Sequence, residues 1–184
     1  MGHGEEGSAV NDGAIHFSLA VVEGIHLAGL VEEFTDVLTS FGEEPDPGLG
    51  RLTPDPYPDD AEASAEFAAA TRDDLLDRRT SDAAIVRSDL TPFLATAAED
   101  LAEDEALAPR DVVIPASDID AWLRTLTALR LVIATRLDIT ADDDEHDLED
   151  PRFGVYDWLG FRLDGLIALA DAQDDISGAG YPTD

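Results

Sequence analysis

Apolar residues recur at steps of three and four along most of this chain, the spacing that gathers side chains on one side of a helix. Four long stretches show this spacing, over residues 19–41, 61–90, 117–137 and 156–173, and a weaker one lies within 93–109. In the second half of 117–137, apolar side chains occupy nearly the whole circumference, which is typical of a helix at the centre of a fold. The pattern predicts a mainly helical protein with 117–137 near its middle.

Two short segments follow the pattern of a β-strand instead. Residues 14–19, AIHFSL, alternate apolar and polar side chains, and residues 111–115, DVVIP, form a short β-type run. Unpaired strand backbone would leave hydrogen-bonding groups unsatisfied, so we expect the two segments to pair with each other. The predicted fold class is mainly α, a single-domain helix bundle of about four to six helices with a short two-stranded β ribbon.

Prolines and glycines mark the boundaries of these elements. Residues 43–60 hold five prolines and two glycines, so this segment is predicted to be a loop without a regular element. Asp59 or Asp60 stands where it can cap the helix that follows. Gly24 and Gly29 fall inside the first helix, where they either weaken it or mark close packing against a neighbour.

A length of 184 residues suits one domain, which we place at 13–176, between a flexible acidic tail at 1–12 and a flexible tail at 177–184. No apolar run approaches the roughly 18 residues that cross a bilayer, so we expect no membrane association. The polar N-terminus lacks the features of a secretory signal. We therefore expect a cytoplasmic protein.

The chain has no cysteine, which excludes disulfides, thiol catalysis and thiol redox sensing. It carries 42 acidic and 11 basic residues, a formal net charge of −31, and every basic residue is arginine. A GC-rich genome and a salt-adapted source both account for this balance. Such a charge repels nucleic-acid phosphate and anionic membranes, whereas it attracts a basic protein surface. We expect a protein partner and no direct nucleic-acid binding.

The acidic segment between the last two long helices resembles a calcium-binding loop in its spacing. Asp138, Asp142 and Glu149 fall at ligand positions, but Asp143 stands where the sharp turn of such a loop needs glycine. In a chain this acidic, chance spacings of carboxylates are common, so we interpret the segment as a solvated connection that caps a helix. No nucleophile, phosphate-loop or paired-histidine motif is present, and we expect no catalytic residue, no metal and no cofactor.

The scarce arginines are more informative than the carboxylates. Arg124, Arg130 and Arg136 are six residues apart, so successive ones point about 120° away from alignment and cannot form one basic stripe. Arg130 interrupts an apolar surface and needs a carboxylate or carbonyl partner, for which Glu66, Asp157 and the acidic segment are candidates. We favour internal ion pairs that fix the register of the helices.

An anion pocket is the alternative use of these arginines. It would combine Arg51, Arg130 and Arg136 with Tyr57 and Tyr156. The aromatic residues of the last two long helices allow two interpretations as well. Trp122, Tyr156 and Trp158 are expected to anchor these helices to each other, although aromatic anchors also mark binding grooves.

Three stretches of the chain, 51–67, 121–140 and 155–169, resemble the motifs of an actinobacterial domain-of-unknown-function family, also described as similar to the oxidative stress regulator AosR. The positions that match its motifs are Arg51, Pro54, Tyr57, Asp60, Glu66, Phe67, Trp122, Leu123, Arg124, Arg130, Arg136, Tyr156, Asp157 and Trp158.

The resemblance implies a regulator without assigned catalytic activity that acts through protein contacts in stress transcription, and members are often encoded beside the proteolytic adaptor ClpS. Where the family has Asn and Gln-Glu, this chain has Thr127 and Leu163-Asp164. These differences change a polar cluster.

The leading functional hypothesis is therefore a noncatalytic regulatory or adaptor domain, with the 43–60 segment and Tyr156–Trp158 as its contact region. One alternative is a small-molecule or metal-binding protein, or an enzyme, whose pocket combines Arg51, Glu66, Arg130 and Asp157. A second alternative is a structural dimer module with a large apolar face on helix 19–41 or on residues 153–172.

Overall fold

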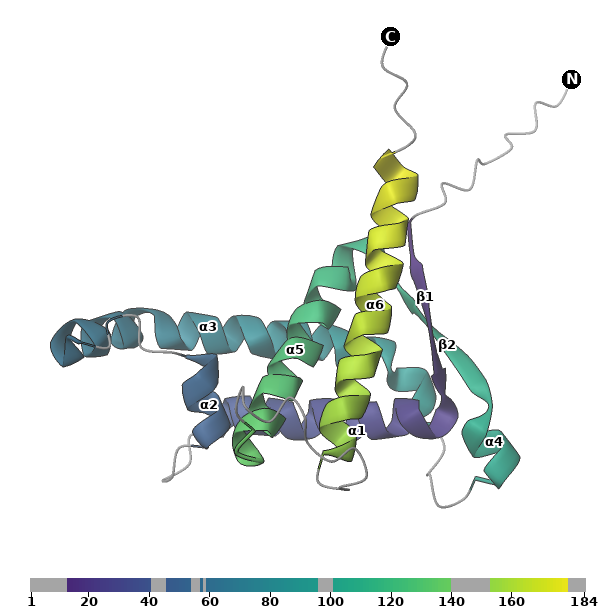
Figure 1. The fold of residues 1–184 in the computed structure, drawn as a ribbon, viewed down its shortest axis with the longest axis horizontal. Coiled ribbons are helices and arrows are strands. Elements are labelled where there is room, and N and C mark those ends of the chain that lie inside the picture. The colour runs from purple at the N-terminus through teal and green to yellow at the C-terminus, as the bar shows by residue number, and fades with distance from the viewer. Residues whose placement is uncertain are drawn as a thin grey trace, which may run out of the picture.

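A computed structural model gives the fold of the protein (Figure 1). The residues it describes are 13–40, 46–53, 57, 59–95, 101–139 and 153–178. They form six α-helices and one two-stranded antiparallel sheet, so the predicted mainly helical fold class is confirmed. The expected tail at 1–12, residues 179–184 and the acidic connection over 140–152 lie outside the described residues.

The β ribbon joins two segments that are far apart in the sequence. Strand β1 (Ile15–Ala20) pairs with β2 (Pro109–Ile114), in a register that sets Ile15 opposite Ile114. Alternate residues of β1 are buried, as the apolar and polar alternation predicts. The ribbon therefore carries one apolar face into the core, and its predicted pairing is confirmed.

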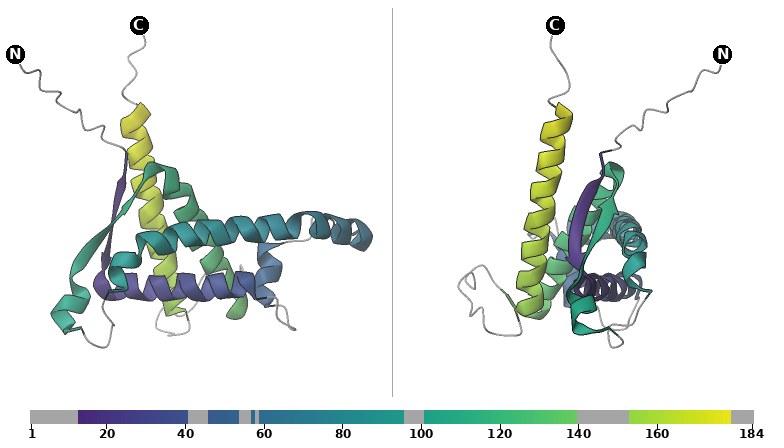
Figure 2. Two further views of the ribbon diagram at one scale, coloured as in Figure 1. Left: turned by 180° about the vertical axis from the view of Figure 1, so that it is seen from behind. Right: turned by 90° about the vertical axis from the view of Figure 1, so that its right-hand side faces the viewer.

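Two pairs of helices make up most of the rest of the core. Helices α1 (Val21–Thr39) and α3 (Ala61–Asp89) pack together, and α5 (Ile119–Arg136) and α6 (Gly154–Gly178) form a second pair that crosses them (Figure 1). Helix α5 contacts α1, α2, α3 and α6, which confirms its predicted central place. Figure 2 shows α6 along one side of the molecule, so its outer face is open to solvent.

The two halves of α3 have different surroundings. Its C-terminal half buries Leu76, Ala83 and Val86 against the neighbouring helices, whereas its N-terminal half projects from the body (Figures 1 and 2). The first turn is capped by Asp60, whose carboxylate accepts from Glu62 N at 3.2 Å and Ala63 N at 3.0 Å. The predicted cap is thus confirmed.

The prediction of a loop throughout 43–60 is wrong, because α2 (Pro47–Leu52) lies within it. Pro47 occupies the first turn, where its missing N–H costs nothing, and Asp46 Oδ1 accepts from Gly48 N at 2.7 Å. The helix packs on α5 and buries Leu49 and Leu52. Tertiary burial of these leucines outweighs the local preference of the glycines.

The remaining elements are short, and one long helix ends later than its pattern predicts. Helix α4 (Glu103–Leu107) and the 3₁₀ turns η1 (Thr91–Phe93) and η3 (Ala116–Asp118) complete the fold. Helix α6 continues to Gly178, five residues beyond the expected end of its apolar pattern at 173. No helix among the described residues is long and apolar enough to cross a membrane.

At Gly24, helix α1 packs closely against Phe93 in the turn after α3. A Cβ atom at this position would lie 2.1 Å from the Phe93 ring, and that ring is fully buried. At Gly29, one and a half turns further along the same helix, a Cβ atom would meet nothing within 4 Å. Close packing therefore explains the first glycine and not the second.

We expect Gly24→Ala to destabilise the protein by about 1–3 kcal/mol, because the buried ring has no room to retreat. Gly29→Ala is the matched control, and it should stabilise by about 0.5–1 kcal/mol through its lower backbone entropy in the unfolded chain. Urea denaturation followed by circular dichroism measures both. Equal effects of the two substitutions would contradict the packing argument.

Candidate functional site

A carboxylate in the first turn of α1 connects three elements. Glu23 Oε2 accepts from Ala20 N at 2.8 Å, which satisfies the backbone where β1 becomes α1. Its Oε1 accepts from Trp158 Nε1 at 2.8 Å and from Arg162 Nη2, both on α6. Burial raises the pKa of Glu23. The hydrogen bonds from Arg162, Trp158 and Ala20 together lower it by more, so the net pKa lies below its ordinary value.

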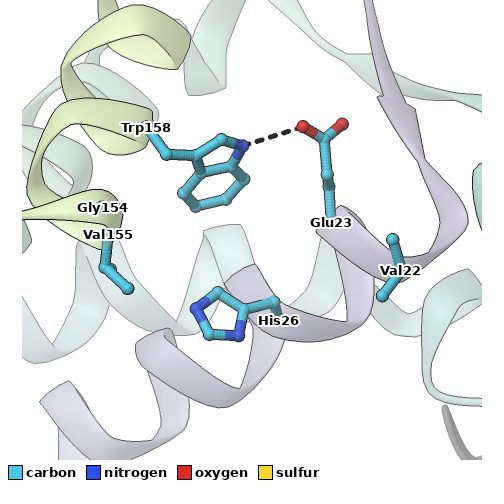
Figure 3. A pocket seen from close by; sticks show the side chains of 6 residues that line it. All are labelled: Val22, Glu23, His26, Gly154, Val155 and Trp158. Carbon is cyan, nitrogen blue, oxygen red and sulfur yellow. Dashed lines mark hydrogen bonds between the residues drawn. The ribbon is translucent and has the colours of Figure 1, made fainter. Parts of the chain in front are cut away.

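Beside this carboxylate lies an open cavity of about 310 Å³ between α1 and α6. Its lining residues are Val22, Glu23, His26, Gly154, Val155 and Trp158, and Figure 3 shows them around the opening. The His26 and Trp158 rings meet edge to face, with centroids 5.9 Å apart. Because both Glu23 oxygens are engaged in hydrogen bonds, the cavity is suited mainly to an apolar group.

Arg124 ties α5 to α3 through a two-pronged ion pair. Its Nε donates to Asp82 Oδ2 at 2.8 Å and its Nη2 to Asp82 Oδ1 at 3.2 Å, while Asp120 Oδ2 lies 3.4 Å from Nη1. Asp82 is buried, so the guanidinium supplies the charge that this carboxylate needs. The hydrogen bonds to Asp82 raise the pKa of Arg124.

Arg136 serves the same purpose at the other end of α5. Its Nη2 donates to Asp46 Oδ2 at 2.8 Å, and the other oxygen of Asp46 caps α2. Burial raises the pKa of Asp46, whereas the hydrogen bonds from Arg136 and Gly48 N lower it more, so the net pKa is lowered. One carboxylate thus starts α2 and holds it on α5, and both arginines serve the architecture.

Arg130 makes a contact with an aromatic ring that the sequence did not predict. Its guanidinium stacks on the Tyr156 ring, 4.1 Å from the centroid, and no carboxylate of the described residues pairs with it. Gly160 permits this approach, because a Cβ atom there would lie 3.2 Å from Arg130 Nε. That Nε is buried, and within the described part of the chain it has no hydrogen-bond partner. Among the described residues Arg130 therefore makes a cation–π contact and no ion pair, and the acidic segment, which was also a candidate partner, lies mostly outside them.

Of Arg51, Glu66, Arg130 and Asp157, the residues of the alternative small-molecule pocket, Arg130 alone lines one of the cavities found among the described residues. The cavity beside Arg130 has a volume of about 210 Å³ and lies between α5 and α6. Thr127, Arg130, Leu131, Ala134, Tyr156 and Leu163 line it. Arg51 is exposed on α2 and Glu66 is exposed on the projecting half of α3. Asp157 lies on α6 next to Tyr156 but is not one of the lining residues.

The aromatic anchors join more elements than the last two helices. Trp122 is fully buried and donates from Nε1 to Asp89 Oδ2 at 2.9 Å, and its ring meets Phe17 edge to face, so it connects α5 with α3 and β1. Trp158 connects α6 with α1 through Glu23. Tyr156 makes the expected link between α5 and α6, because the Arg130 guanidinium lies over its ring. Tyr57 stands apart, exposed against α3.

The spacing of residues along the chain did not indicate that Glu23, Arg162, Asp46 and Asp82 connect helices. For Glu23 a signal existed, since an acidic residue in the third position of a helix is typical of a capping box. The capping box was hard to recognise from the sequence, because the capping position holds Ala20, which has no side-chain acceptor. The partners of the other three depend on which helices meet, and the spacing of residues along one helix does not carry that information.

A comparison with protein families finds that one family model matches residues 6–170, most of the chain. The chain belongs to the DUF2017 family, a domain of unknown function. Searches of curated proteins and of solved structures found no match to this DUF2017 domain. Over the residues with described positions, the domain holds no group of three or more His, Asp or Glu side chains arranged to bind a metal ion.

We expect Glu23→Gln to destabilise this DUF2017 domain by about 1–3 kcal/mol at neutral pH, because the charged hydrogen bond from Arg162 is weakened. The folded pKa of Glu23 lies below its ordinary value of 4.5, so its charge stabilises the fold above that pH. This contribution is lost as the pH falls through the folded pKa. Urea denaturation between pH 7 and pH 3 should show the two proteins converging at acidic pH.

Glu33→Gln is the control for this experiment, since Glu33 is exposed on the same helix. It removes the same charge and should leave stability within about 0.5 kcal/mol of the wild type at every pH. A Glu23→Gln variant that remained as stable as Glu33→Gln at neutral pH would show that the junction of α1 and α6 does not depend on this carboxylate.

Proposed function

We propose that this DUF2017 domain is a noncatalytic regulatory or adaptor domain that acts by binding another protein, and that the outer face of α6 is the contact surface. The observation that carries the proposal is Phe161, which is 69% exposed on that face. An aromatic ring held in solvent gains most when it enters a pocket of a partner, and aromatic residues are the commonest anchors of protein interfaces.

The Phe161 side chain stands next to a fixed part of the structure. The adjacent Arg162 lies over its ring, 5.3 Å from the centroid, and is itself bound to Glu23 of α1. Trp158 of α6 also donates a hydrogen bond to Glu23 and so helps to hold the helix in place. A ring presented from a rigid helix loses little conformational freedom on binding, which favours affinity.

The charges around Phe161 indicate what kind of partner would fit. Asp164, Ala168, Asp171 and Asp175 follow Phe161 at alternating steps of three and four, so they share its face, and all are exposed. An aromatic anchor at the head of an acidic row is complementary to an apolar pocket beside a basic surface. The proposed partner is therefore a protein with lysines or arginines around such a pocket.

The family resemblance supports a more specific version of this function. It implies an AosR-like actinobacterial protein that acts in the cytoplasm, in contact with the transcription machinery during stress. A chain without cysteine would exert that role through binding and without thiol chemistry. Arg124, Arg136 and Arg162 are already paired with carboxylates that hold helices together, so they are not available for a catalytic site. This favours a binding role over a catalytic one.

We expect Phe161→Ala to weaken binding to a specific partner at least tenfold. The partner is first captured on immobilised wild-type protein from a lysate of the source organism, identified by mass spectrometry, and then titrated in purified form by calorimetry. Leu107→Ala is the control, since it removes a similarly exposed apolar side chain from α4. If the Phe161 and Leu107 variants retained the same partners with equal affinity, α6 would not be the contact surface.

The acidic row on α6 leads to a separate prediction. Replacing Asp164 and Asp171 together by lysine should slow association with the partner by about tenfold at low salt, because electrostatic steering acts mainly on the association rate. The same charge change at Glu33 and Asp36 on α1 is the control. Stopped-flow or surface-plasmon measurements over a range of salt provide the rates, and identical rates for both double variants would argue against a basic partner on α6.

A further inference from the structure

A cavity of about 330 Å³ lies among helices α2, α3 and α5, and no described residue of α6 lines it. Both α2 and α3 pack against α5 (Figure 1). Leu52 of α2 and Leu123, Ala128 and Leu131 of α5 supply the apolar part of the lining, and two arginines and Thr127 complete it. In a chain with 11 basic and 42 acidic residues, two guanidinium groups at one apolar cavity depart from the charge of the rest of the molecule.

Of the two arginines, Arg79 of α3 has the less compensated charge. Its Nη2 donates to the Leu52 carbonyl at 3.3 Å, a long hydrogen bond, and its buried Nε has no partner among the described residues. No described carboxylate forms an ion pair with Arg79. Burial lowers the pKa of Arg79, and the attraction of Asp82 offsets part of this effect. A partly buried charge that its surroundings compensate poorly is typical of binding sites.

Asp82 cannot compensate Arg79 fully, because Arg124 engages both of its oxygens. Arg124 Nε donates to Oδ2 and Nη2 to Oδ1, at 2.8 and 3.2 Å. Asp120, 3.4 Å from Arg124 Nη1, is exposed, so water screens its charge. Thr127 adds no donor, since its Oγ1 donates to the Leu123 carbonyl at 2.7 Å. Arg79 is therefore the group of this cavity that can bind an anion.

The surroundings of Arg79 define the kind of anion that fits. A carboxylate accepts two parallel hydrogen bonds from a guanidinium, and the two Nη groups can donate them, because Leu52 uses one N–H of Nη2. The leucines of the lining favour a hydrocarbon body attached to that carboxylate. A phosphate dianion fits less well, because Asp82 and Asp120 lie beside Arg124 and repel a second negative charge.

We propose that this cavity binds a small organic monocarboxylate. Its carboxylate pairs with the Nη groups of Arg79, and its hydrocarbon body lies against Leu52, Leu123 and Leu131. The Arg124–Asp82 pair fixes the wall of the site and does not contact the ligand's charge. Because the lining comes from three helices, the bound acid stabilises their packing. This activity goes beyond the protein contact proposed for α6.

The first test compares ligands that share one body and differ in charge. Octanoate and 4-phenylbutyrate are the probes, and octanamide, the uncharged analogue of octanoate, is the control. Calorimetry at physiological salt should show octanoate binding about tenfold or more tightly than octanamide, since a charge-assisted hydrogen bond is worth that much. Inorganic phosphate should bind more weakly than either acid. Equal affinity for octanoate and octanamide, or no binding of either acid, would overturn the proposal.

The second test asks whether Arg79 provides the preference for the charged ligand. Arg79→Met removes the charge but keeps a long side chain, and the preference for octanoate over octanamide should disappear. Arg79→Lys keeps the charge and should retain part of the preference. Arg78→Met is the matched control, since Arg78 is exposed on the same helix, and it should keep the full preference. Circular dichroism checks that each variant is folded.

Thermal unfolding of the ligand-free variants separates binding from a purely structural role. We expect Arg79→Met to unfold at the same or a higher temperature than the wild type, because it removes a poorly compensated charge. A preference for octanoate that persisted in Arg79→Met would overturn the proposal, whatever the stability of that variant, and would leave Arg79 as a support for α2. Both experiments leave Phe161 unchanged and need no protein partner, so their failure would not affect the function proposed for α6.

Discussion

The contact on which the structure depends most is the carboxylate of Glu23 in the first turn of α1. Its two oxygens satisfy the backbone at the junction of β1 and α1 and receive the Trp158 and Arg162 side chains of α6. A helix that begins at residue 21 is thereby attached to one that begins at residue 154. The position of α6, and with it the presentation of its outer face, follows from this one partly buried charge.

Several of the scarce arginines join helices through ion pairs. In the described structure, Arg124 joins α5 to α3, Arg136 joins α5 to α2, and Arg162 joins α6 to α1. Asp46, Asp82 and Glu23 supply their carboxylates, and most other acidic side chains among the described residues are exposed. The excess of negative charge thus lies on the surface, where it affects partners, whereas the few positive charges hold the helices in register.

Periodicity alone predicted the long helices, the ribbon and the central place of α5, because burial repeats at fixed steps within each element. It failed for α2, where Leu49 and Leu52 are buried only because α5 lies next to them. It also gave no sign of the stacking of Arg130 on Tyr156, because that contact depends on Gly160 and Tyr156 lying on one face of α6. The projection of Phe67 could not be predicted either, since exposed and buried apolar residues follow the same spacing.

The pairing of β1 with β2 has a kinetic consequence. The strands lie roughly ninety residues apart in the chain, so their contact closes a large loop and costs more entropy than any contact within a helix. Helices α1 and α3, which are near neighbours in sequence, can associate before that loop closes. We therefore expect the ribbon to form after α1 and α3 have associated, so the closing of this loop adds to the folding time of the domain.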